Sequence, residues 1–224
     1  MTDKGLIEYL SGFATTERVQ RFKEVLADRT RYITVVLEEL YQEQNASAVV
    51  RTCDCFGIQD VHVIEGKNKF SVNDSIAMGA SKWLSVHKYK MTELKLKECI
   101  DQLKDRNYRI VATVPDPNAV PLDKFDLSKG RTALMFGTEL NGLSEESKSF
   151  ADEFLYIPMA GFTESFNISV SAGIILSHLS QLLRKSNLDW KLREEERDEL
   201  ILSWLRESVK SAELLEAEYY MKRS

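Results

Sequence analysis

Two short apolar segments in the C-terminal half of the chain each run directly into an irregular loop that contains glycine. These segments are residues 132–136 and 154–157, and helix-type sequence follows the two loops from 144 and from 167. Successive strand–loop–helix units are typical of α/β folds, in which ligands bind at the carboxyl ends of the strands. The pattern therefore predicts an α/β chain with a binding site between residues 131 and 176.

The rest of the chain alternates between the same two kinds of segment. Spaced apolar positions predict helices, whereas β-branched or continuous apolar runs predict strands. Further strands are expected at 33–37, 61–64 and 109–114, and further helices from 15, at 45–55 and at 93–104. Because several strands are apolar throughout, we predict a parallel sheet with helices on both faces.

Residues at the helix boundaries agree with this assignment. Side chains that can cap a helix N-terminus stand at Thr15, Asn45, Thr92 and Ser144. Gly57 is typical of a helix C-terminus. These signals set the limits of the expected helices.

The chain divides into three expected parts. A helical arm covers 1–30, the main domain covers 31–186, and a C-terminal helical extension covers 187–224. The extension contains only helix-type sequence, which predicts one or two amphipathic helices. Residues 66–82 are polar and loop-like, with a short helix expected near Ser75.

Composition excludes several classes of protein. The 224 residues, 43% of them hydrophobic, suffice for a domain with a buried core. No apolar run reaches the length of a membrane span, and the N-terminus lacks the features of a secretory signal. The cysteines, Cys53, Cys55 and Cys99, are odd in number and lack the spacing of a zinc site. We expect a cytoplasmic protein with no membrane or metal partner.

Charge is distributed unevenly along the chain. The net charge of −5 by itself argues against nucleic-acid binding. Local distribution matters more than the sum, however. A basic cluster near the N-terminus comprises Arg18, Arg21, Lys23, Arg29 and Arg31. On charge alone a solvated helix face is the slightly better interpretation; the alternative is an RNA-binding surface that includes Arg18 and Arg21.

The two common nucleotide-binding motifs are absent. No G-x-G-x-x-G follows the first expected strand, and no Walker lysine motif occurs. This excludes a Rossmann dehydrogenase and a P-loop enzyme. A cofactor site, if present, is therefore expected at the C-terminal half of the sheet.

The first glycine-containing loop could bind a ligand through its backbone. Gly137 follows a buried strand and permits close approach to the main chain, and Gly142 suits a positive φ angle. Glu139 places a carboxylate at the carboxyl edge of the sheet. Taken alone, the segment could equally be a plain strand–turn–helix connection capped by Ser144.

The second loop combines backbone groups with apolar side chains. Ile157, Met159 and Phe166 could form the walls of an adenine site. Ser165 and Asn167 stand at a helix start, where capping is the default role, but both could direct their side chains into a site.

Asn45 and Arg51 stand six residues apart in one expected helix. Asn45 could cap that helix. Arg51 is surrounded by apolar residues and could pair with an acid. Alternatively, its guanidinium could bind a phosphate in a bidentate manner.

Together these segments resemble the three motifs of the SpoU/TrmH branch of the SPOUT superfamily, which are RNA 2′-O-ribose methyltransferases. The motifs read Asn45 with Arg51-Thr52, FGTELNGLS from Phe136, and IPMAGFTESFNISV from Ile157. They occur in the family's order and span residues 45–176, so the combination is far more specific than any single motif.

The resemblance implies a fold and a cofactor. The fold is a SPOUT-type parallel sheet whose C-terminal third forms a deep trefoil knot, with flanking helices and helical extensions at both ends. The cofactor is S-adenosylmethionine. Its implied contacts are Thr113, Gly137, Ile157, Met159 and Phe166.

The resemblance also implies a homodimer, in which Arg51 from one subunit completes the site of the other. Glu139, Ser165 and Asn167 match positions that shape the site, and Asn45 matches one that supports the reaction. The family scheme makes Arg51 the general base. Because arginine stays protonated in proteins, we expect it instead to bind an RNA phosphate and orient the ribose hydroxyl.

The implied activity is 2′-O-methylation of tRNA, at guanosine 18 of the D-loop. The short arm before the first motif favours tRNA, because relatives that act on ribosomal RNA often carry a separate N-terminal RNA-binding domain. The alternatives are methylation of ribosomal RNA or of another tRNA position, and RNA binding without catalysis.

Overall fold

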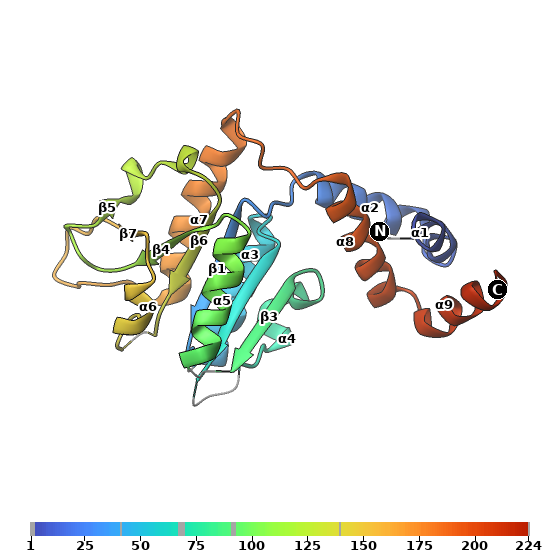
Figure 1. The fold of residues 1–224 in the computed structure, drawn as a ribbon, viewed down its shortest axis with the longest axis horizontal. Coiled ribbons are helices and arrows are strands. Elements are labelled where there is room, and N and C mark those ends of the chain that lie inside the picture. The colour runs from blue at the N-terminus through green and yellow to red at the C-terminus, as the bar shows by residue number, and fades with distance from the viewer. Residues whose placement is uncertain (1–2, 41, 67–69, 91–92, 139, 224) are drawn as a thin grey trace. The chain divides into compact units, whose positions relative to one another are not determined.

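The computed structural model describes residues 3–40, 42–66, 70–90, 93–138 and 140–223, and the chain divides into two compact units (Figure 1). One unit combines the N-terminal segment up to Arg29 with the C-terminal segment from Lys191. The other unit runs from Thr30 to Trp190.

The terminal unit is helical. Its helices are α1 (Lys4–Ser11), α2 (Thr16–Ala27), α8 (Glu194–Ser208) and α9 (Ala212–Met221). Helix α8 packs against α1 and α2, so the two ends of the chain share one small core. In that core the Phe22 and Trp204 rings meet edge to face at 5.4 Å, and the Arg29 guanidinium lies 5.6 Å from the Trp204 ring centre.

The central unit is built on a seven-stranded parallel sheet. Its strands are β1 (Ile33–Glu38), β2 (Asp60–Glu65), β3 (Ser85–Lys90), β4 (Arg109–Thr113), β5 (Val120–Pro121), β6 (Thr132–Phe136) and β7 (Glu153–Tyr156). The order across the sheet is β3-β2-β1-β6-β4-β7-β5, and every neighbouring pair is parallel. The carboxyl ends of β6, β4 and β7 therefore lie side by side.

Helices cover both faces of this sheet. They are α3 (Glu43–Cys55), α5 (Glu93–Asp105), α6 (Glu145–Ser149) and α7 (Ile168–Lys185). The remaining short elements are α4 (Asp74–Ala77), η1 (Ala80–Lys82), η2 (Leu122–Lys124) and η3 (Leu127–Lys129). None of the helices in the described part of the chain is long and apolar enough to cross a membrane.

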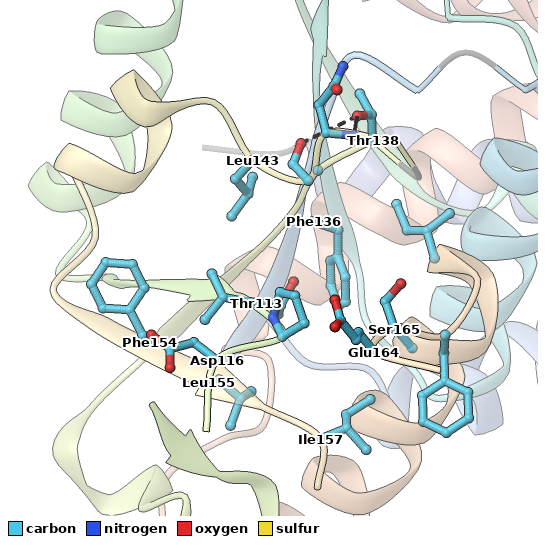
Figure 2. Close-up of a pocket in the computed structure, with 18 of the residues that line it drawn as sticks. Thr113, Asp116, Phe136, Thr138, Leu143, Phe154, Leu155, Ile157, Glu164 and Ser165 are labelled. Carbon is cyan, nitrogen blue, oxygen red and sulfur yellow. Dashed lines mark hydrogen bonds between the residues drawn. The ribbon is translucent and has the colours of Figure 1, made fainter. Parts of the chain in front are cut away.

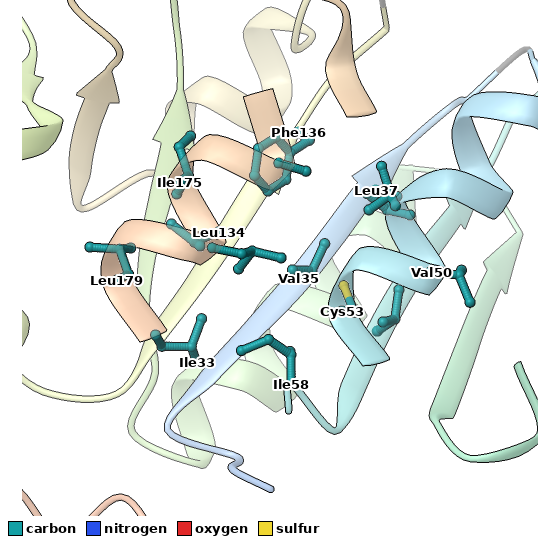
Figure 3. Packing of buried hydrophobic residues seen from close by; sticks show 14 of the residues in the cluster. Ile33, Val35, Leu37, Val50, Cys53, Ile58, Leu134, Phe136, Ile175 and Leu179 are labelled. Carbon is teal, nitrogen blue, oxygen red and sulfur yellow. The ribbon is translucent and has the colours of Figure 1, made fainter. Parts of the chain in front are cut away.

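Alternating strand residues supply two cores. On one face Val35, Leu134 and Phe136 pack against α3 and α7, which contribute residues such as Cys53 and Ile175 (Figure 3). On the other face Val36, Ala133 and Met135 join the buried residues of α5. Both faces are buried, which explains why these strands are apolar throughout.

The parallel α/β sheet and the predicted strands are confirmed, with small differences at their ends. Thr15 and Ser144 cap α2 and α6 as predicted, and Gly57 has a φ angle of 75°. The C-terminal extension contains two helices, α8 and α9, in agreement with the predicted one or two. The predicted cap at Thr92 lies outside the described residues.

Three assignments differ from the sequence expectation, at Asn45 and at the strands β3 and β5, of which β5 has only two residues. Asn45 is not a helix cap, because α3 begins two residues earlier at Glu43 with Gln42 at the N-cap. Strand β3 was not expected: its sequence SVHKYK is polar because it forms an edge of the sheet and is only partly buried. An edge strand with lysines also resists pairing with other chains.

Candidate active site

A pocket of about 540 Å³ opens at the carboxyl ends of β6, β4 and β7. Figure 2 shows Thr113, Leu155 and Ile157 from the strand ends around it, together with Phe136 and Ser165. Helix α7 closes one side. The volume lies within the usual range for small-molecule and cofactor sites, and this edge is where α/β sheets place them.

The loop after β6 forms one wall and is folded back on itself. The Thr138 and Gly142 main chains exchange two hydrogen bonds, of 2.9 and 3.0 Å. Gly142 turns the chain with a φ angle of 64°, which favours glycine. A Cβ atom on Gly137 would lie 2.1 Å from the Gly142 carbonyl carbon and 2.2 Å from the Leu143 nitrogen. Only glycine therefore fits where the two limbs of this loop meet.

The loop after β7 forms the opposite wall. Ile157, Met159, Ser165 and Phe166 all line the pocket. The loop ends at Asn167, which caps α7: its Oδ1 accepts hydrogen bonds from the Ser169 main-chain nitrogen at 2.8 Å and hydroxyl at 2.6 Å. The start of α7 is thus held in place by its own first turn.

Asn45 and Asn167 are in direct contact although 122 positions separate them in sequence. The Asn167 amide nitrogen donates to Asn45 Oδ1 at 3.1 Å, and the Asn45 amide donates to Gln42 Oε1 at 3.0 Å. Asn45 is buried, so its amide is used within the protein rather than at a helix end. The first and third sequence motifs therefore meet through this pair.

The five residues predicted to contact a cofactor all line the pocket: Thr113, Gly137, Ile157, Met159 and Phe166. Ser165 lines it as well. Glu139 lies outside the described residues. Asn45 and Asn167 are not among the lining residues. The chemical roles of these side chains remain predictions.

Arg51 stands apart from the pocket of its own chain. It is an exposed residue of α3, and its Nη1 donates a long hydrogen bond of 3.4 Å to the Ile76 carbonyl. Arg18 and Arg21 are exposed on α2 in the terminal unit, where Arg21 faces Glu24 at 3.5 Å. These three arginines therefore do not form one surface within the central unit.

Charged side chains give the pocket a negative balance. Asp116, Glu164 and Lys148 are the ionisable groups among its described lining residues. Lys148 pairs with the exposed Glu145 at 2.8 Å. Two carboxylates against one ammonium favour a positively charged ligand.

None of these three charged residues is among the site residues predicted from sequence. Asp116 follows β4, so the rule that sites lie at strand ends could have identified it. Lys148 lies inside a short helix, and no local signal identifies it. Among the described residues, no group of three His, Cys, Asp or Glu side chains is arranged to hold a metal ion.

Comparison with known proteins gives consistent matches. Residues 32–177 match the SpoU rRNA Methylase family. A curated relative from Borreliella burgdorferi, named tRNA (guanosine(18)-2′-O)-methyltransferase, is 44% identical over 210 residues, which is 94% of each chain.

Solved structures agree with these matches. The crystal structure of the A. aeolicus TrmH/SpoU tRNA modifying enzyme superposes with a TM-score of 0.77 at 31% identity, covering 87% of this chain and 98% of that one. The SpoU methyltransferase AviRb from Streptomyces viridochromogenes, solved in complex with AdoMet, superposes with a TM-score of 0.58 at 20% identity and covers 73% of this chain and 62% of its own. The second likeness concerns the fold alone.

Proposed function

Because the chain belongs to the SpoU rRNA Methylase family, we propose that it methylates a ribose 2′-hydroxyl of tRNA, at guanosine 18 of the D-loop, using S-adenosylmethionine. The observation that carries this proposal is the 44% identity, over 94% of both chains, to an enzyme named for that reaction. The proposed place of action is the cytoplasm.

The pocket fits the proposed cofactor. Gly137 presents main chain to the pocket, Ile157, Met159 and Phe166 add apolar surface, and the negative balance suits a sulfonium. When bound, S-adenosylmethionine supplies an activated methyl group. The protein's part is to bind and orient it, which can remove much of the barrier to a bimolecular transfer.

Arg51 is the proposed phosphate ligand. A guanidinium keeps its charge in proteins and can hold a phosphate through two parallel hydrogen bonds. Arg51 is exposed, and its hydrogen bond to the Ile76 carbonyl is long, so the guanidinium is accessible to RNA. Holding the phosphate would align the adjacent ribose hydroxyl. Arg18 and Arg21 are proposed to contribute further phosphate contacts.

The proposed working form is a homodimer in which Arg51 acts on the partner's pocket. Two observations support this. Arg51 does not line the pocket of its own chain. In addition, Phe162, Phe166 and Val170, at the second loop and the start of α7, expose large apolar side chains. A second copy could cover that surface and bring its arginine to the site.

We further propose that the C-terminal third of the central unit forms the trefoil knot expected for this family. The order of the strands supports it, because β6 lies between β1 and β4 rather than after β4. The structural match to the A. aeolicus enzyme, at a TM-score of 0.77, also supports it.

The activity is tested with tritiated S-adenosylmethionine and unmodified tRNA transcripts. We expect label in tRNA, located at guanosine 18 by mass spectrometry, and none in a transcript that carries 2′-deoxyguanosine there. Label only in ribosomal RNA or at another tRNA position would support the alternative substrates. RNA binding without transfer would support a non-catalytic protein.

Arg51→Ala should nearly abolish turnover while leaving cofactor affinity within about twofold, because Arg51 is proposed to bind the RNA phosphate and not the cofactor. Mixed dimers then test whether Arg51 of one subunit completes the site of the other. At a cofactor concentration well below the Kd of Gly137→Ala, the Arg51→Ala and Gly137→Ala chains should each have little activity alone. They should regain activity when mixed, because one site then combines an intact pocket with the other chain's Arg51. No recovery in verified mixed dimers would refute the shared site.

A further inference from the structure

Glu38 is a buried carboxylate at the carboxyl end of β1, and both of its oxygens bind the same residue. Its Oε2 accepts a hydrogen bond from the Ser144 main-chain nitrogen at 3.0 Å, and its Oε1 accepts one from the Ser144 hydroxyl at 2.6 Å. The residue is only 3% exposed. A carboxylate removed from water is costly unless such bonds satisfy it, so this contact strongly constrains both partners.

Ser144 links the Glu38 carboxylate to helix α6. Its hydroxyl oxygen also accepts a hydrogen bond from the Ser147 nitrogen at 3.1 Å and so caps the helix. The carboxylate therefore fixes the residue at which the loop after β6 ends and the helix begins.

Strand β1 holds both ends of that loop. Leu37 pairs with Phe136 in the sheet, directly before the loop starts, and Glu38 binds Ser144, directly after it. Between these points, Thr138 and Gly142 join the two limbs of the loop (Figure 2). The described residues at both ends of this loop are therefore held by hydrogen bonds.

The loop after β6 forms a wall of the pocket, whereas Glu38 does not line the pocket. Gly137, Thr138, Gly142 and Leu143 line the pocket, whereas Glu38 is absent from the described lining residues. A change at Glu38 therefore acts on a bound molecule indirectly and not through a contact of its own.

We propose that Glu38 is a positioning residue that presets the loop after β6 for the methyl donor. This inference rests on the proposed function, because it concerns the cofactor of that reaction. Its physical basis is preorganisation: a loop that is already ordered loses less conformational entropy when a ligand binds. The sequence predicts a capping role for Ser144 and no role for Glu38.

The test compares cofactor affinity with loop protection in the full-length protein. Glu38→Ala should raise the Kd for S-adenosylmethionine, measured by calorimetry, by roughly tenfold to a hundredfold, the size expected from losing hydrogen bonds to a charged group. Without cofactor, hydrogen exchange of the amides at 140–144 should accelerate. The Kd for tRNA should stay unchanged. Glu38→Gln can still accept from the Ser144 nitrogen, so it should recover most of the affinity, to within about threefold of the unaltered protein.

Thr34 provides a matched control in the same strand. It is fully buried, and its hydroxyl donates to the Asp60 carbonyl at 2.7 Å, away from the pocket. Thr34→Val should lower the melting temperature without changing cofactor affinity or loop exchange.

Two results would overturn the proposal. One is an equal loss of cofactor affinity in the Glu38→Ala and Thr34→Val variants, which would indicate a general stability effect. The other is unchanged affinity and loop exchange in Glu38→Ala. Either can be told from failure of the proposed function, in which the unaltered protein itself would neither bind S-adenosylmethionine nor transfer its methyl group.

Discussion

Replacing Gly137 by alanine is the most direct perturbation of the pocket. The added Cβ atom would lie 2.1 Å from the Gly142 carbonyl carbon and 2.2 Å from the Leu143 nitrogen. Ordinary contacts of a Cβ atom begin near 3.4 Å. Both obstructing atoms belong to the main chain, so no side-chain rotation can relieve the clash.

The loop must therefore open by more than about 1 Å, which breaks the pair of hydrogen bonds between Thr138 and Gly142. Each lost backbone bond costs about 1 kcal/mol, and overpacking costs about 1–3 kcal/mol. The two lost bonds and the overpacking together cost about 3–5 kcal/mol in the free energy of unfolding of the central unit. For a domain of this size the melting temperature should fall by roughly 6–20 °C.

Cofactor affinity should fall as well, because the opened loop no longer forms the same wall. If restoring the loop costs about 2–4 kcal/mol of that energy, the Kd for S-adenosylmethionine rises by roughly thirtyfold to a thousandfold. Calorimetric titration measures the affinity, and thermal melting measures the stability.

Gly161→Ala is the matched control for this change. Gly161 lies in the second loop, and its added Cβ atom would meet nothing closer than the Thr163 nitrogen at 4.0 Å. We expect cofactor affinity and melting temperature close to those of the unaltered protein. The steric argument is refuted if Gly137→Ala binds S-adenosylmethionine as tightly as Gly161→Ala does.

Two further predictions concern titratable groups outside the pocket. Burial in the sheet, with His87 stacked on it, lowers the pKa of His62 from 6.5 to about 4. The unfolded chain binds a proton there first, so stability is complete above pH 6.5 and declines as the pH falls towards 4; between pH 7 and pH 5 the loss is about 2 kcal/mol. Urea unfolding should show this loss in the unaltered protein and a shallower one in His62→Asn, and parallel profiles would contradict it. Burial also raises the pKa of Cys99 to about 12, and Cys53 is buried, whereas Cys55 is exposed. A thiol reagent should therefore modify one cysteine in the native protein and three after unfolding, and Cys55→Ser should remove the native reaction; rapid modification of Cys99 in the native state would be the contrary result.

Local patterns in the sequence determined the secondary structure and the class of fold. Apolar runs such as 132–136 can be satisfied only by burial on both faces of a sheet, and capping residues such as Thr15 act within one helical turn. The edge strand β3 was not predicted, because its partial exposure permits a polar sequence that lacks this apolar signal. Asn45 was misassigned because its partner is not in its own helix: it accepts a hydrogen bond from Asn167, far along the chain.

In the site, too, some features follow from local sequence and others depend on contacts between distant segments. The two glycine-containing loops could be identified from sequence because glycine and strand-end positions are local signals, and all five predicted cofactor contacts line one pocket. Sequence alone could not indicate that β6, β4 and β7 end side by side, because strand order depends on contacts between distant segments. For the same reason only the tertiary structure identified the bond between Glu38 and Ser144, which are 106 positions apart. A buried carboxylate needs a partner, but the sequence does not specify where in the chain that partner lies.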